Sequence, residues 1–219
     1  MIIDIDVVSD FVCPWCFLGK HRLDKALAEL SAERPQLRFR INWLPYFLNP
    51  DTPPQGEPYR DFIEGKFGGA RQADEMLRRV AEAAQPDGLH FAFERIQTRP
   101  STLDAHRLAY RAQSLGQRPE RIVALVDGLF RGHFQDGLDI GDRGVLADLA
   151  ARIGDERLRV EDYLASDEGV AEVTRMAGQV QREGVSGVPF FIIDRRLAVS
   201  GAQSSGVLGA ALLQALEAR

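Results

Sequence analysis

The order of apolar and polar positions predicts strand, helix and strand at the start of the chain. Residues 2–8 form a short, largely apolar stretch with the length of a strand. Between residues 17 and 34, leucines and alanines recur at helical spacing, which indicates a helix. Residues 37–43 alternate apolar with polar side chains and predict a second strand with one covered face. Because a helix connects the two strands, they should run parallel.

The middle of the chain, from about residue 59 to residue 183, has the periodicity of helices. A proline-rich loop at residues 45–58 precedes it. The clearest amphipathic helix begins at Pro119, and we expect Ser101 to cap another helix. Further helices are predicted over residues 61–67, 70–84, 160–165 and 167–182.

After Gly184 the pattern returns to strands. Residues 190–193 predict a strand and residues 197–199 its hairpin partner, and Ser204 or Ser205 can cap a closing helix. The simplest assembly is one α/β domain built from both chain ends, residues 1–55 and 184–219. A helical domain of residues 56–183 is then inserted through its middle.

Composition and charge narrow the classes of function. Hydrophobic residues make up 45% of the 219 positions and charged residues 27%, which is the profile of a globular protein. The net charge of −5 argues against a nucleic-acid partner, and no apolar run has the length of a membrane span. The start of the chain is acidic where a signal peptide is basic. We therefore expect a cytoplasmic protein, in which a disulfide is more often transient and catalytic than structural.

The two cysteines of the chain, Cys13 and Cys16, stand where the first predicted strand passes into the first helix. The first turn of a helix has unpaired N–H groups and the positive end of the dipole, and both favour a thiolate. Pro14 suits the first helical position. We expect Cys13 at an exposed cap and Cys16 one turn in, close enough to form a disulfide. The apolar neighbours Trp15 and Phe17 should raise the pKa of Cys16, whereas Lys20 should be solvated.

A zinc site and a structural disulfide are weaker interpretations of the Cys-x-x-Cys pair. Zinc needs four ligands, but there is no second cysteine pair, and the four histidines lack ligand spacing, so we expect no metal site. A purely structural disulfide is also disfavoured, because so short a loop contributes only about 1–2 kcal/mol. Redox chemistry is the favoured interpretation.

Longer segments around these features resemble a known family. They are residues 9–20 (Ser-Asp-Phe-Val-Cys-Pro-Trp-Cys-Phe-Leu-Gly-Lys), 104–108, 184–191 and 201–203. In these segments the chain resembles DsbA-type oxidoreductases, and within them the FrnE-like branch of dithiol–disulfide isomerases first associated with polyketide biosynthesis. The resemblance implies a thioredoxin-like fold with an inserted all-helical domain.

The same resemblance implies roles for individual residues. Cys13 would be the nucleophile of dithiol–disulfide exchange and Cys16 the resolving thiol, with a cis peptide before Pro189 packed against the disulfide. We expect Pro14, Trp15, Val188 and Pro189 to contact substrate, the Val188 backbone by pairing with an extended chain.

One position departs from the family pattern. Thioredoxin and DsbA carry a buried acid six residues before the first cysteine, and this position is Val7 here. Asp10 or a water molecule is an alternative acceptor for the proton of Cys16, although Asp10 is equally explained as a turn residue.

Three functions follow from these observations. The leading one is a cytoplasmic thiol–disulfide oxidoreductase that acts on protein or small-molecule substrates, needs no cofactor beyond its redox-active disulfide, and uses glutathione at most as a co-substrate. The second is a glutathione-dependent isomerase or transferase resembling 2-hydroxychromene-2-carboxylate isomerase or the kappa-class transferases. Those enzymes usually carry serine at the position of Cys13, so the retained pair favours exchange. The third is a redox-sensitive chaperone or metal-binding module.

Overall fold

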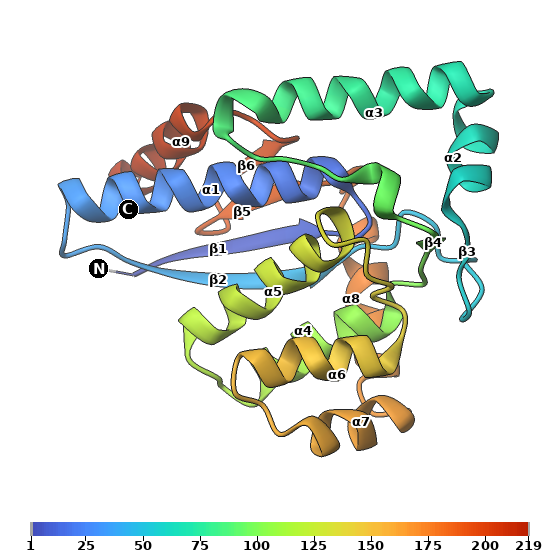
Figure 1. The fold of residues 1–219 in the computed structure, drawn as a ribbon. Coiled ribbons are helices and arrows are strands. Elements are labelled where there is room, and N and C mark those ends of the chain that lie inside the picture. Colours follow the sequence, from blue (N-terminus) through green and yellow to red (C-terminus); the bar gives the residue numbers. More distant parts are fainter. Residues whose placement is uncertain (1, 219) are drawn as a thin grey trace. The chain divides into compact units, whose positions relative to one another are not determined.

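The structure is a computed structural model that describes residues 2–218 (Figure 1). It divides into two compact units, Met1–Tyr46 with Arg175–Arg219, and Phe47–Thr174. Met1 and Arg219, which the predicted domain ranges include, lie outside the described residues. The first segment of the α/β unit ends at residue 46 where residue 55 was predicted, and the second begins at residue 175 where residue 184 was predicted, so each boundary comes nine residues early. The reason is local: Val180 belongs to one apolar cluster with Val8 of the first unit, and Tyr46 packs against that cluster.

The first unit is built on a four-stranded sheet with the order β2-β1-β5-β6. Its strands are β1 (Ile2–Ser9), β2 (Arg38–Pro45), β5 (Phe190–Ile193) and β6 (Leu197–Ser200). As predicted, β1 and β2 are parallel, and β5 and β6 form an antiparallel hairpin. β5 also pairs antiparallel with β1, so the two ends of the chain meet in the middle of one sheet.

Helices cover both faces of this sheet. On one face, Val7 stands in register with Trp43 and Phe191, and all three are buried. A methyl group added at Gly19 of α1 (Pro14–Glu33) would lie 3.2 Å from Cζ of Phe191, so α1 covers this face. α9 (Ser205–Glu217) lies beside α1 (Figure 1).

The opposite face is covered near the end of β1. Val8 packs there with Val180 of α8 (Val170–Arg182) and with Val185. The predicted cap of the closing helix is confirmed, because the Ser204 hydroxyl accepts a hydrogen bond of 3.3 Å from the Val207 N–H.

The second unit is mainly helical. Its helices are α2 (Tyr59–Phe67), α3 (Ala70–Ala84), η1 (Gln85–Asp87), η2 (Phe93–Arg95), α4 (Leu103–Ser114), α5 (Pro119–Phe134), α6 (Arg143–Arg152), α7 (Arg157–Ala165) and the start of α8. The short strands β3 (Glu57–Pro58) and β4 (Thr98–Arg99) form an antiparallel pair, which the expectation of an all-helical insert does not include.

The prediction that Ser101 caps a helix is wrong by one residue. Thr102 is the N-cap of α4, because its carbonyl accepts the first helical hydrogen bond, 3.0 Å from the N–H of His106. The Thr102 side chain makes no capping bond.

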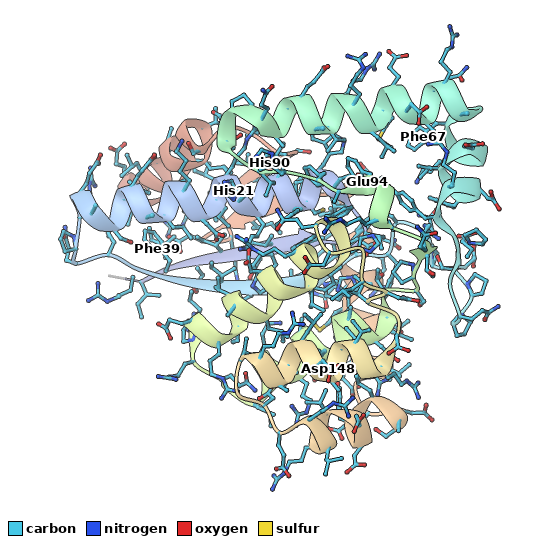
Figure 2. All side chains as sticks on the ribbon, in the orientation of Figure 1. His21, Phe39, Phe67, His90, Glu94 and Asp148 are labelled. Atoms are coloured by element: carbon cyan, nitrogen blue, oxygen red, sulfur yellow. The ribbon has the colours of Figure 1, made fainter. Side chains whose placement is uncertain are left out.

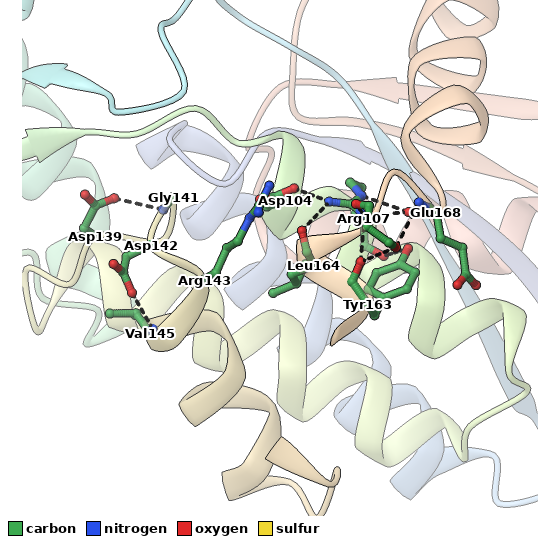
Figure 3. Close-up of polar contacts among 11 residues, drawn as sticks. Asp104, Arg107, Asp139, Gly141, Asp142, Arg143, Val145, Tyr163, Leu164 and Glu168 are labelled. Atoms are coloured by element: carbon green, nitrogen blue, oxygen red, sulfur yellow. Dashed lines mark hydrogen bonds and ion pairs between the residues drawn. The ribbon is translucent and has the colours of Figure 1, made fainter. Parts of the chain in front are cut away.

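A buried arginine holds the end of α7 (Figure 3). The Arg107 side chain is 1% exposed, and its Nη2 donates to the carbonyls of Tyr163, Ser166 and Glu168 at 2.9, 2.6 and 2.8 Å. Its Nη1 pairs with Asp104 at 2.5 Å. A helix leaves its last four carbonyls without helical partners. Arg107 therefore supplies donors both to the end of α7 and to the turn that leads into α8.

Candidate active site

The two cysteines lie where β1 ends and α1 begins. The Cys13 N–H donates to the Asp10 carbonyl at 3.0 Å, which closes a turn after the strand. Cys13 is the N-cap of α1, and its carbonyl accepts hydrogen bonds from the N–H groups of Cys16 and Phe17 at 3.0 and 3.2 Å. Pro14 follows in the first helical turn, as its missing N–H predicts. Both cysteines are thiols in this structure.

The expectation that Cys13 is exposed is wrong, since only 4% of the residue is accessible. Part of this burial comes from the loop before β5. The Cys13 Sγ lies 3.8 Å from the Val188 carbonyl oxygen, although the two residues are 175 positions apart. The Val188–Pro189 peptide bond is cis, as the family resemblance implies.

Gly19 lets α1 approach this loop closely. A Cβ at this position would lie 2.8 Å from Cγ of Pro189, closer than real Cβ atoms come, and 3.3 Å from Cβ of Pro189, which is a tight contact. The missing side chain of Gly19 thus makes room for the Pro189 ring. Two elements from opposite ends of the chain thereby meet beside the thiol of Cys13.

Cys16 is almost completely shielded, with 1% of the residue accessible. Burial raises the pKa of the Cys16 thiol well above its ordinary value, and Cys13 raises it further. Cys13 acts by a side-chain hydrogen bond and by charge repulsion. The Asp10 backbone and the Ser9 side chain act in the opposite direction. The expected rise in the pKa of Cys16 is confirmed.

The neighbours of the pair differ in exposure. Trp15 is 38% exposed and offers an aromatic surface between the two cysteines in sequence. The prediction that Lys20 is solvated is wrong, because its side chain is 5% exposed and pairs with Asp24 at 2.7 Å. The spacing of four residues between these opposite charges was the signal in the sequence for that ion pair.

The four histidines of the chain belong to four different parts of the fold. They come from separate elements, with His21 on α1 and His90 between η1 and η2 (Figure 2), His106 on α4 and His133 on α5. Within residues 2–218, no group of three or more His, Cys, Asp or Glu side chains is arranged to hold a metal ion. In the same range, no helix is long and apolar enough to cross a membrane.

Comparison with known proteins identifies the family. A model of the DSBA-like thioredoxin domain matches residues 4–213. The chain is a member of the DSBA-like thioredoxin domain family. The predicted thioredoxin-like fold and the resemblance to DsbA-type oxidoreductases are thereby confirmed.

Two similar proteins cover most of this DSBA-like chain. Uncharacterized protein YwbO of Bacillus subtilis (strain 168) is 25% identical over 202 residues, which are 88% of each chain. The crystal structure of probable DsbA oxidoreductase SCO1869 from Streptomyces coelicolor is 31% identical, with a TM-score of 0.85, and the match covers 99% of this chain and 91% of the other.

Two more distant structures show a likeness of fold alone. Cytosolic disulfide reductase DsbM from Pseudomonas aeruginosa, solved with GSH, is 19% identical with a TM-score of 0.66 over 98% of this chain and 99% of its own. A 2-hydroxychromene-2-carboxylate isomerase is 16% identical with a TM-score of 0.71 over 100% and 97% of the two chains.

This DSBA-like protein lacks the buried acid that the family pattern places six residues before the first cysteine. Val7, at the position of the family's buried acid, is 1% exposed and packs in the core. Asp10 is 1% exposed and Ser9 3% exposed. The sequence pointed to Asp10 only as one alternative and did not single out Ser9. A serine at a strand end is normally explained by the turn that follows it.

Proposed function

We propose that this DSBA-like protein exchanges disulfides with protein or small-molecule substrates, as a member of the FrnE-like branch. In the proposed reaction the Cys13 thiolate attacks a substrate disulfide R–S–S–R′, forms Cys13–S–S–R and releases R′–S⁻. The Cys16 thiol then loses its proton and attacks Sγ of Cys13. That step forms the Cys13–Cys16 disulfide and releases R–S⁻, so the substrate gains two electrons and the protein loses two. The reverse sequence oxidises a substrate dithiol.

The contrast between the two cysteines carries this proposal. Cys13 is the N-cap of α1, at the positive end of the helix dipole, and its Sγ lies beside the Val188 carbonyl. Cys16 is buried in the first turn, and the raised pKa of its thiol keeps it protonated until it is needed. An attacking thiolate and a shielded resolving thiol are the two parts that exchange requires.

We assign substrate contacts to the residues around the Cys13 thiol. Trp15, 38% exposed, offers apolar surface, and Pro14 lies between it and Cys13. The backbone of Val188 would pair with an extended substrate, and Pro189 would limit access to the disulfide. Backbone pairing of this kind suits a peptide without demanding a particular side chain.

Glutathione is the proposed small-molecule partner, and the cytoplasm the proposed location. The cytosolic DsbM, solved with GSH, supports both by its likeness of fold. The fold also matches an isomerase, so two assays are needed. We expect reduction of insulin disulfides to be catalysed, and glutathione conjugation of an electrophile to be undetectable. The opposite result would favour the isomerase or transferase function.

Two single variants test the roles of Cys13 as the attacking thiol and Cys16 as the resolving thiol. When incubated with insulin, Cys16→Ser should accumulate a covalent complex on a non-reducing gel that dithiothreitol releases, because no thiol remains to resolve it. Cys13→Ser should form no complex and lose exchange activity. Equal trapping by the two variants would contradict the assigned roles.

A further inference from the structure

The alternation of side chains along β1 puts Ser9 on the face of the sheet that α1 covers, where Cys16 lies. Side chains two residues apart on a strand lie on the same face, so Ser9 shares the face of Val7. That face carries Phe191 in register with Val7 and is covered by α1. Cys16 lies in the first turn of α1 and is 1% exposed. The Ser9 side chain thus points into the layer that holds the buried thiol.

The Ser9 hydroxyl is buried but lacks the hydrogen bond that a buried polar group usually makes. Ser9 is 3% exposed, and among the described residues its hydroxyl oxygen has no hydrogen-bond partner. Buried polar side chains nearly always have one. A thiol is only a weak acceptor, whereas a thiolate accepts a hydrogen bond strongly. A thiolate at Cys16 would therefore be a strong acceptor for the Ser9 hydroxyl, which has no such acceptor among the described residues while Cys16 is a thiol.

We propose that the Ser9 hydroxyl is a positioning group that donates a hydrogen bond to the Cys16 thiolate during resolution of the mixed disulfide. This inference rests on the proposed function. In the step concerned, Cys16 passes its proton to water, and its thiolate attacks Sγ of Cys13. The bond between Cys13 and the substrate sulfur breaks, and the departing R–S⁻ takes up a proton. The Ser9 proton stays on its oxygen throughout.

The charges around Cys16 explain why this hydrogen bond matters at that step. In the free dithiol, Cys13 raises the pKa of Cys16 by a side-chain hydrogen bond and by charge repulsion. In the mixed disulfide, the Cys13 sulfur carries neither a proton nor a charge, so both effects are gone. Burial then remains the main obstacle to ionisation, opposed by the Ser9 hydroxyl and the Asp10 backbone. Lys20, one turn further along α1, is already paired with Asp24.

The role of Ser9 can be tested with 5,5′-dithiobis(2-nitrobenzoic acid) on the full-length reduced protein. Attack by Cys13 releases one coloured thionitrobenzoate anion, and resolution by Cys16 releases a second. Stopped-flow absorbance separates the two phases, so the first is an internal control for folding and for the reactivity of Cys13. The variants are Ser9→Ala, which removes the hydroxyl, and Ser9→Thr, which keeps it.

We expect Ser9→Ala to leave the first phase unchanged and to slow the second by roughly three- to fourfold at pH 7, because the loss of thiolate outweighs its gain in nucleophilicity. The pH midpoint of the second phase should rise by about one unit. Above that midpoint the variant should be as fast as the wild type or faster, because a less stabilised thiolate is the better nucleophile. Ser9→Thr should restore the wild-type profile, which a purely structural role of Ser9 does not predict.

Each other outcome has a defined meaning. An unchanged second phase in Ser9→Ala, or equal slowing in Ser9→Ala and Ser9→Thr, would overturn the inference about Ser9. If Ser9→Ala does not fold, Ser9→Gly removes the same hydroxyl without adding a methyl group and faces the same criteria. If the wild type releases only one thionitrobenzoate, the proposed dithiol mechanism itself fails, and Ser9 is not the cause.

Discussion

At the scale of single residues, Gly19 controls how closely α1 approaches the loop before β5. The nearest atom to an added Cβ is Cγ of Pro189, at 2.8 Å, and it belongs to a rigid ring that cannot rotate away. We predict that Gly19→Ala lowers the free energy of unfolding by about 1–3 kcal/mol, the usual cost of overpacking. It should also slow attack by Cys13, because the loop beside its Sγ must move.

Gly209 of α9 is a matched control for this substitution. It is also a helical glycine, but an added Cβ there would meet no atom within 4 Å. Gly209→Ala should raise the free energy of unfolding by about 0.5–1 kcal/mol, because alanine is the better helix former. Urea denaturation measures both variants. Equal effects of the two substitutions would refute the crowding at Gly19.

The buried Cys16 thiol should make stability depend on pH. Its pKa is raised in the folded protein, whereas in the unfolded chain it is about 8.5. Below pH 8.5 both states hold the proton. Above it the unfolded chain releases the proton and the folded protein keeps it, so stability falls with a slope of up to about 1.4 kcal/mol per pH unit.

This dependence is measured by urea denaturation of the reduced protein. Between pH 8 and pH 9.5, the wild type should lose about 1 kcal/mol more stability than Cys16→Ser, which has no thiol at this position. Cys13 is present in both proteins, so the difference belongs to Cys16. Parallel losses in the two proteins would show that Cys16 ionises as readily in the folded protein as in the unfolded chain.

At the scale of elements, Arg107 ties the end of α7 and the start of α8 to α4. Its guanidinium donates to four carbonyls, those of Tyr163, Leu164, Ser166 and Glu168, and it also contacts the Asp104 carboxylate. A lysine has the same charge, but it cannot reach several acceptors with a planar group of donors. Arg107→Lys should therefore lower the free energy of unfolding by about 3 kcal/mol.

Arg143 is the control for this prediction, because it contacts the other oxygen of Asp104, at 2.9 Å, from a side chain that is 53% exposed. Arg143→Lys should cost at most about 1 kcal/mol. Denaturation of the two variants under the same conditions makes the comparison. If both substitutions cost the same, the carbonyl contacts of Arg107 contribute nothing measurable.

At the scale of the whole molecule, local patterns were enough to predict most elements, the parallel pair of β1 and β2, and the hairpin of β5 and β6. The apolar run before Cys13, the helical spacing after it and the late hairpin each follow from nearest neighbours in sequence. Pro14 and Ser204 marked the starts of α1 and α9 by their own backbone or side-chain chemistry.

What was missed depends on contacts between distant segments. The burial of Cys13 involves Val188, and the burial of Arg107 involves a turn about sixty residues away. Ser9 stands out only when strand alternation, the covering helix and its burial are considered together. The hydrophobic pattern of a chain predicts on which face of a helix or strand a side chain lies. It does not predict which distant segment of the chain packs against that face.

The long sequence separation between Cys13 and Val188, which lies beside it in the fold, has a consequence for biosynthesis. A ribosome adds about 5–20 residues per second. Val188 comes 175 residues after Cys13, so it is added roughly 9 to 35 s later. Throughout that interval the nascent chain carries both thiols without the segment that will lie beside them. Each new molecule thus passes through a stage in which its cysteines are open to the thiols and oxidants of the cell before it can select its own substrates.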